Sequence, residues 1–90
     1  MNSLDHPFRI LVIDDDDVDR LAVRRLLKRS NFDADIEEAS TGGMALKLSV
    51  SREFECILLD FHLSDMDGLE FLSRMADAHP GDIPAIVILT

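Results

Sequence analysis

The 90-residue sequence has one cysteine, no tryptophan or tyrosine, and no long apolar run. No run approaches the length of a membrane-spanning helix, about 18 residues, so we expect no transmembrane segment. Residues Met1 to Pro7 are polar and lack the basic-then-apolar order of a signal peptide. Cys56 lies in an apolar run, and we interpret it as a small buried hydrophobic residue; the alternative is a reactive thiol. These absences predict a cytoplasmic, reducing environment.

Positive charge is also scarce. The sequence contains nine lysine and arginine residues but 18 aspartate and glutamate residues, so its net charge is −9. This balance disfavours nonspecific binding of nucleic acid, and it favours cationic ligands, including metal ions, and basic partner surfaces. Several basic residues fall in one segment, and we interpret them as part of a helix surface rather than a binding patch: Arg20, Arg24, Arg25, Lys28 and Arg29.

Apolar residues make up 47 % of the chain, enough for the core of one domain over residues 1–90. Three segments rich in valine, isoleucine and leucine are nearly continuous apolar runs: Arg9–Ile13, Cys56–Leu59 and Ala85–Leu89. Such runs predict parallel strands that are buried on both faces. A fourth segment, Ala34–Glu38, alternates apolar and charged residues, which predicts an edge strand.

Between these strands the apolar residues follow helical periods. After the first strand, one stripe recurs at i, i+3, i+4 and i+8: Val18, Leu21, Ala22 and Leu26. This stripe predicts an amphipathic helix with its apolar side toward the core. Asp16 and Asp17 precede it as an N-cap and a first-turn acid, and basic residues end it, which suits the helix dipole.

Two further helices are predicted. The first has a weaker apolar stripe: Met44, Ala45 and Leu48. The second runs from about Leu69 to Asp77, where Asp67 and Glu70 form a capping arrangement and Pro80 ends the helix. Strands and helices thus alternate along the whole chain. This order predicts an α/β fold with a doubly wound parallel sheet, in which ligands bind beyond the carboxyl ends of the strands.

Polar residues follow three of the predicted strands. Asp14 and Asp15 follow the first, Asp60 follows Ile57-Leu58-Leu59, and Thr90 follows the fourth strand. If these strands are neighbours, three carboxylates and one hydroxyl converge on one edge of the sheet. Carboxylates held so close need a cation, and oxygen ligands with room for water suit Mg²⁺. We therefore predict a magnesium site there.

Each acidic residue also has a structural interpretation. Asp14 and Asp15 could cap a helix, although matching polar residues after two other strands argue against this. Asp19 is interpreted as a solvated helix residue. The segment Asp65–Gly68 is interpreted as a turn with a helix cap, and a turn there could also shape the site.

Four segments give the chain a strong resemblance to the receiver domains of two-component response regulators. They are ILVIDDDD, ASTGGMAL, CILLDFHLSDMDGLEFL around Asp60, and DIPAIVILT, and the resemblance extends from about Phe8 to Thr90. It implies a flavodoxin-like receiver fold with strand order 2-1-3-4. It also implies a phosphorylated signalling domain that is not an enzyme, although the domain assists its own phosphorylation and dephosphorylation.

The resemblance assigns roles to individual residues. Asp60 would accept a phosphoryl group from a phosphohistidine on a sensor histidine kinase or a histidine phosphotransfer protein. Asp15 would bind Mg²⁺ directly, Asp14 would bind it through water, and His62 would supply its backbone carbonyl. Thr90 would donate a hydrogen bond to the phosphoryl group and serve as a switch residue.

The chain departs from the family pattern in two places. Ser64 stands where the family commonly has proline, which predicts a slightly looser loop. The family continues beyond Thr90 with a fourth helix, a fifth strand that carries a lysine, and a fifth helix. Lys28 and Lys47 fall in predicted helices and cannot replace that lysine. We therefore expect an incomplete receiver, weaker phosphorylation, and self-association through the exposed fourth-strand edge.

Three alternatives remain open. A receiver-like domain could signal without phosphorylation. A haloacid-dehalogenase-type phosphatase would use Asp14 as nucleophile and Asp16 as acid/base, but this leaves Asp60 unexplained. A calcium loop could use Asp15, Asp17 and Asp19, although Arg20 stands where such a loop needs glycine.

Overall fold

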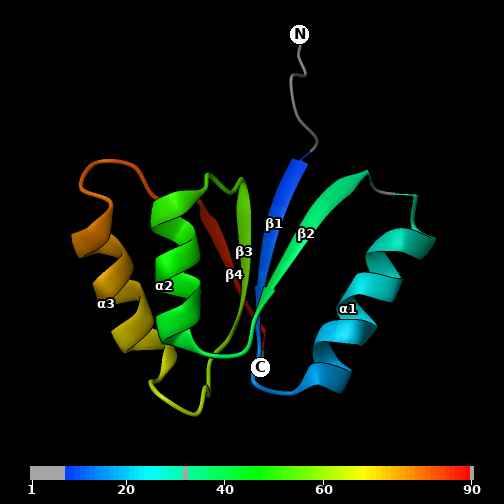
Figure 1. The fold of residues 1–90 in the computed structure, drawn as a ribbon, viewed down its shortest axis with the longest axis horizontal. Coiled ribbons are helices and arrows are strands. Elements are labelled where there is room, and N and C mark those ends of the chain that lie inside the picture. The colour runs from blue at the N-terminus through cyan, green and yellow to red at the C-terminus, as the bar shows by residue number, and fades with distance from the viewer. Residues whose placement is uncertain (1–7, 32, 90) are drawn as a thin grey trace, which may run out of the picture.

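A computed structural model describes residues 8–31 and 33–89, which form four strands and three helices in strict alternation (Figure 1). The strands are β1 (Phe8–Ile13), β2 (Ala34–Ala39), β3 (Cys56–Asp60) and β4 (Ala85–Leu89). The helices are α1 (Asp17–Arg29), α2 (Gly42–Ser51) and α3 (Gly68–Ala78). All strand pairs are parallel, and the order is β2-β1-β3-β4. The predicted α/β class and strand order are thus confirmed.

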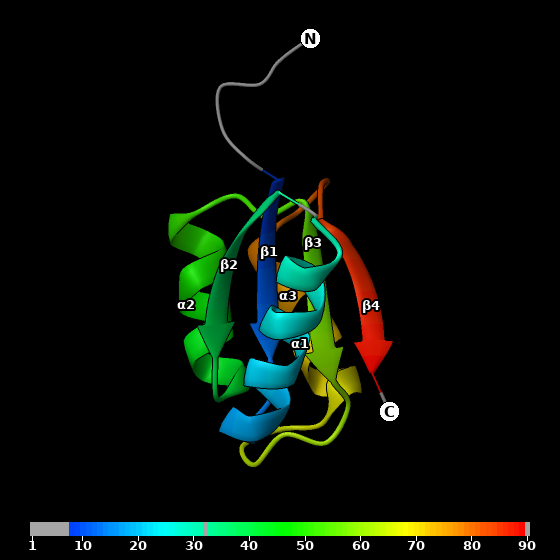
Figure 2. The same cartoon turned by 90° about the vertical axis from the view of Figure 1, so that its right-hand side faces the viewer.

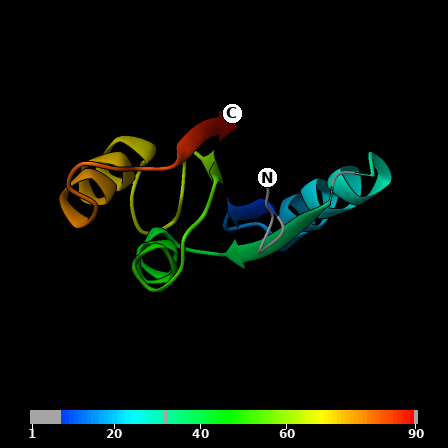
Figure 3. The ribbon, with the colours of Figure 1, turned by 90° about the horizontal axis from the view of Figure 1, so that it is seen from above.

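The helices cover the sheet from both sides, as in a doubly wound fold. Helix α1 lies on one face, and α2 and α3 lie together on the other (Figures 2 and 3). The main core fills the space between the sheet and the α2–α3 layer. Its largest fully buried members are Leu11, Ile13, Ile57, Leu59, Phe71 and Met75. The described helices lack the combination of length and apolar character that crossing a membrane requires.

Helix α1 begins as predicted but turns a different side toward the sheet. Asp16 is its N-cap and accepts a hydrogen bond from the Val18 amide at 2.9 Å. The predicted inward stripe is wrong: Val18 is 68 % exposed and Leu26 is 64 % exposed. The half-buried positions are instead Arg20, Val23, Arg24 and Leu27. Arg20 and Arg24 lie on this side of the helix and both form ion pairs with Glu38 of β2, as described below.

The prediction for α2 is correct in part. Ala45 is fully buried, and Leu48 packs against the core. Met44 is exposed instead, so it does not extend the inward stripe. In α3, the Asp67 side chain accepts a hydrogen bond from the Glu70 amide at 2.8 Å, which confirms the predicted cap.

The two edge strands differ from each other. Strand β2 lies at one edge, as its alternating pattern predicted. Strand β4 lies at the other edge, where it pairs with β3 (Figure 2). The prediction that Ala85–Leu89 is buried on both faces is wrong, because Val87 is 47 % exposed and Ile88 is also exposed. An edge position with little helix cover among the described residues explains the exposure. Thr90, the residue after β4, lies outside the described residues.

Candidate metal centre

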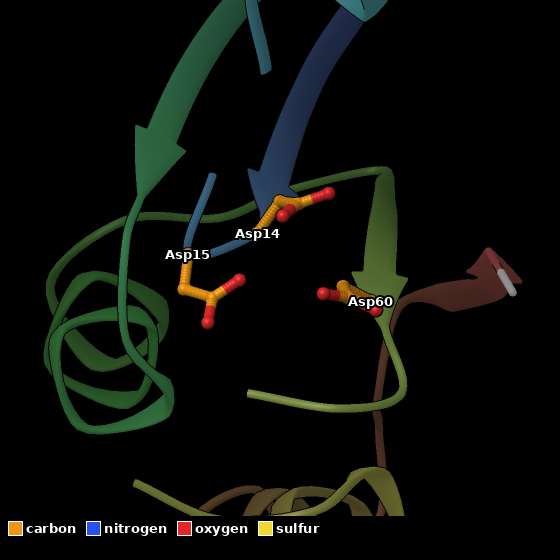
Figure 4. Close-up of side chains that lie close together, drawn as sticks. All are labelled: Asp14, Asp15 and Asp60. Atoms are coloured by element: carbon orange, nitrogen blue, oxygen red, sulfur yellow. The ribbon is translucent and has the colours of Figure 1, made fainter. Parts of the chain in front are cut away.

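The carboxyl ends of β1 and β3 lie side by side at one edge of the sheet. The register pairs Ile13 with Leu59, so the next residues, Asp14 and Asp60, follow at the same level. Asp15 joins them from the loop after β1 (Figure 4). One carboxylate oxygen from each of the three residues lies within 4.8 Å of the others. Asp14 is buried, Asp60 is half-buried, and Asp15 is exposed.

Local hydrogen bonds hold Asp14 in place. Its amide donates to the Ala39 carbonyl at 3.1 Å, which continues the β1–β2 ladder by one residue. Its Oδ1 accepts a hydrogen bond from the Asp16 amide at 3.0 Å, which turns the chain toward α1. The consecutive acids therefore divide into two pairs. Asp14 and Asp15 face the cluster, whereas Asp16 and Asp17 begin the helix.

The electrostatics of the cluster favour a cation. Burial raises the pKa of Asp14, and the nearby charges of Asp60, Asp19 and Asp15 raise it further, although the Asp16 amide opposes the change. A bound cation would offset these charges. The three side chains offer only oxygen ligands, which is the donor chemistry that Mg²⁺ takes. The residues present therefore fit a magnesium ion.

The loop after Asp60 returns to the sheet edge and is closed by main-chain bonds. The His62 amide lies 3.3 Å from Asp60 Oδ1, which places the main chain of His62 beside the cluster. At the base of the loop, the Gly68 amide donates to the Phe61 carbonyl at 2.8 Å. His62 and Asp67 also form an isolated antiparallel bridge. Ser64 thus lies in a loop whose two ends are tied together.

Asp65 joins this loop to α2, a contact that the sequence pattern does not indicate. Its two carboxylate oxygens accept hydrogen bonds from the amides of Gly42 and Gly43, each at 2.9 Å. These bonds lower the pKa of Asp65. The neighbouring Met66 packs so closely on Gly42 that a Cβ atom there would lie 2.6 Å from the Met66 sulfur. The segment Asp65–Gly68 predicted a turn with a helix cap. Nothing in that segment indicated that Asp65 contacts a helix distant in the sequence.

Arg20 is the second residue whose contacts the sequence did not reveal. The sequence pattern predicted that it is part of a helix surface rather than a binding patch. In the structure its Nη1 donates to the main-chain carbonyl of Asp14 at 2.6 Å, and its Nε pairs with Glu38 at 3.0 Å. The one signal in the sequence was the acidic residue Glu38 in the predicted strand Ala34–Glu38, whose charge is complementary to that of Arg20.

The alternatives fit the structure less well. The Asp16 side chain caps α1, so it is engaged with the helix rather than free to act as an acid/base beside Asp14. Asp17 and Asp19 lie within α1, which leaves no loop for a calcium ion of the predicted kind.

Comparisons with known proteins agree on one family. The pattern of the response regulator receiver domain matches residues 10–90. The transcriptional regulatory protein SrrA of Staphylococcus aureus (strain NCTC 8325 / PS 47) is 37 % identical over 68 residues. That match covers 76 % of this chain but 27 % of SrrA, so the chain spans about a quarter of its curated relative.

Solved structures show the same likeness. The MaeR response regulator bound to beryllium trifluoride is 29 % identical, with a TM-score of 0.79, and the match covers 91 % of this chain and 66 % of that one. A response regulator from Burkholderia pseudomallei with a phosphorylated aspartic acid and a calcium ion is 33 % identical, with a TM-score of 0.74. That match covers 91 % of this chain and 46 % of the other. The chain therefore belongs to the family of response regulator receiver domains of two-component systems.

Proposed function

We propose that this chain is a phosphoacceptor domain that receives a phosphoryl group on Asp60 in a magnesium-dependent reaction. The observation that carries the proposal is the cluster of Asp14, Asp15 and Asp60, whose carboxylate oxygens lie within 4.8 Å of one another. A relative of known structure carries a phosphorylated aspartic acid, and another binds beryllium trifluoride. The domain is a signalling switch and belongs to a family generally regarded as non-enzymatic.

Asp60 acts as the nucleophile. One of its oxygens attacks the phosphorus of a phosphohistidine, the phosphorus–nitrogen bond breaks, and the histidine nitrogen leaves with the electron pair. Asp15 would bind Mg²⁺ directly, Asp14 would bind it through water, and His62 would contribute its main-chain carbonyl. The ion, when bound, offsets negative charge on the transferring group. The acyl phosphate that forms is reactive enough to hydrolyse, so the modification is reversible.

Thr90 is proposed to report the phosphoryl group. The preceding residue, Leu89, pairs with Asp60 in the sheet register. A threonine hydroxyl that follows this pair can donate a hydrogen bond to the new phosphoryl oxygens, and its movement would carry the signal.

The family implies a cognate histidine kinase as partner. We propose that the donor is the phosphohistidine of such a kinase or of a histidine phosphotransfer protein, in the cytoplasm. We also propose that two copies of this chain associate through β4, an edge strand with exposed apolar residues. The domain itself, with a net charge of −9, does not bind nucleic acid.

Phosphate labelling tests the proposal. The chain is incubated with Mg²⁺ and a small phosphodonor such as acetyl phosphate, and mass spectrometry locates the modified residue. We expect an acyl phosphate on Asp60, and none with the Asp60→Asn variant or with excess chelator. A label on Asp14 with repeated turnover would favour the phosphatase alternative. Magnesium binding without any label, from this donor or from a phosphohistidine protein, would favour a receiver that signals without phosphorylation.

A further inference from the structure

Arg20 is a half-buried cation beside the carboxyl end of β1. Its side chain is 15 % exposed, although it belongs to a helix with no fully buried residue. Its guanidinium reaches two different segments, the Asp14 carbonyl at 2.6 Å and the Glu38 carboxylate at 3.0 Å. A planar guanidinium can hold two acceptors at once in fixed directions, which an ammonium group cannot do equally well.

Glu38 is itself firmly held. Arg24, one helical turn after Arg20, pairs with its other carboxylate oxygen at 2.7 Å. Arg24 also donates to the Ile36 carbonyl at 3.1 Å. The hydrogen bond from Arg24, and then that from Arg20, lowers the pKa of Glu38, against the opposing effect of burial. Arg20 is therefore anchored to β2 through a fixed anion.

The contact with the Asp14 carbonyl controls the direction of the chain at Asp15. The carbonyl oxygen belongs to the planar peptide unit that joins Asp14 to Asp15. A hydrogen bond that holds this oxygen therefore also fixes the orientation of the peptide unit and the direction of the chain into Asp15. The amide of Asp14 and its Oδ1 are held by two other hydrogen bonds, to Ala39 and from Asp16. With Arg20, the turn that carries two of the three clustered carboxylates is held at three points.

We propose that Arg20 is a positioning residue for the metal centre, which orients the Asp14–Asp15 peptide so that both carboxylates face Asp60. The proposal rests on the magnesium-dependent function above. Arg20 is not a ligand, because it is a cation and acts through the main chain. Groups that orient metal ligands typically change metal affinity by about 10- to 100-fold when they are replaced.

A matched pair of substitutions separates positioning from general anchoring of the helix. Arg20→Ala and Arg24→Ala each remove one ion pair to Glu38 from the same helix, but only Arg20 contacts the Asp14 carbonyl. By titration calorimetry, we expect Arg20→Ala to weaken Mg²⁺ binding by about 10-fold or more. Arg24→Ala should weaken it less, because Arg20 then keeps its contact with the Asp14 carbonyl and its own ion pair with Glu38. Arg20→Lys should recover part of the loss, because lysine can satisfy one of the two acceptors. If Arg20→Ala does not fold, the Mg²⁺ affinities of Arg20→Lys and Arg24→Lys are compared instead, and the larger loss is expected for Arg20→Lys.

Hydrogen exchange of the metal-free chain gives a second readout. We expect the amides of residues 14–17 to exchange faster in Arg20→Ala than in Arg24→Ala at equal global stability. Equal losses of Mg²⁺ affinity in the two variants, or unchanged affinity in both, would overturn the role of Arg20. If the parent chain bound no Mg²⁺, the proposed function would fail, and the exchange comparison would still decide whether Arg20 holds this turn.

Discussion

At the scale of single residues, the acidic cluster holds like charges close together, which is unfavourable without a cation. Asp14 is buried, and it lies near Asp15, Asp19 and Asp60, so its pKa is raised. A carboxyl group with a raised pKa binds a proton more readily in the folded chain than in the unfolded chain. Its contribution to stability is therefore present at low pH and is lost as the pH rises through the raised pKa. At neutral pH the metal-free chain carries this cost.

Replacing Asp14 with asparagine should remove the charge and keep the Oδ1 acceptor for the Asp16 amide. We expect the metal-free variant to melt a few degrees higher than the parent at pH 7, and to show no advantage at a pH below the ordinary aspartate pKa. Mg²⁺ affinity should fall about 10-fold or more, since the site loses one formal charge. Circular dichroism follows the melts, because the chain lacks tryptophan and tyrosine. A variant less stable than the parent at pH 7 would contradict this account.

The division of the acidic run gives a second prediction. Asp15 contributes to the cluster, whereas Asp17 is the first residue of α1 and is exposed. Asp15→Asn should weaken Mg²⁺ binding by about 100-fold, because Asp15 is the proposed direct ligand and its loss should exceed the loss of an orienting group. Asp17→Asn removes the same charge two residues away and should change the affinity by less than about threefold, in line with screening at the surface. Equal effects in a calorimetric titration would show that the run acts only through total charge.

At the scale of secondary-structure elements, the centre depends on two loops that are each held by a neighbouring element. The loop after β1 is held by α1 and β2, through Arg20 and Glu38. The loop after β3 is held by the first amides of α2, through Asp65. A carboxylate at a helix N-terminus is also favoured by the helix dipole. Helix α2 therefore contributes to the site although none of its side chains lies in the cluster.

Breaking the Asp65 contact should loosen the loop after Asp60. The depressed pKa of Asp65 means that its stabilising effect is present above the ordinary aspartate pKa and is lost as the pH falls. Asp65→Ala should therefore destabilise the chain by about 1 kcal/mol at pH 7, as the loss of a helix cap does, and by less in acid. Hydrogen exchange should also become faster in residues 61–67.

Thr41→Ala provides the matched control for Asp65. Thr41 is the N-cap of the same helix, and its side chain accepts a hydrogen bond from the Met44 amide at 3.1 Å. Its loss should have a similar cost, about 1 kcal/mol. The Thr41→Ala variant should leave hydrogen exchange in residues 61–67 unchanged. Faster loop exchange in both variants would mean that α2 as a whole, not the Asp65 contact, holds the loop.

At the scale of the whole molecule, sequence patterns located the elements and the acidic cluster because both depend on local rules. A run such as Ile10-Leu11-Val12-Ile13 needs burial, and an acid after a parallel strand must lie at the carboxyl edge. The ion pairs of α1 with β2 and the contact of Asp65 with α2 join residues that lie 14 to 23 positions apart in the sequence. No periodicity within a helix or loop encodes such partners. Cys56 is likewise half-buried rather than buried, because its strand has an incompletely covered face.

The exposed face and edge of β4 lead to the last prediction. Val87 lies in this strand and is 47 % exposed. Within the described residues β4 pairs in the sheet with β3 alone, so its other edge can offer main-chain groups to a second copy. We expect the chain to self-associate as its concentration rises, measured by light scattering coupled to size-exclusion chromatography.

Val87→Lys places a charge on the strand, which should shift the chain to monomer. Val18→Lys is the control, since Val18 is an exposed apolar residue on α1, a helix that packs mainly on β1 and β2, and its replacement should leave association unchanged. A parent chain that stays monomeric at every concentration would rule out pairing through β4, and equal effects of the two lysines would point to general charge repulsion instead.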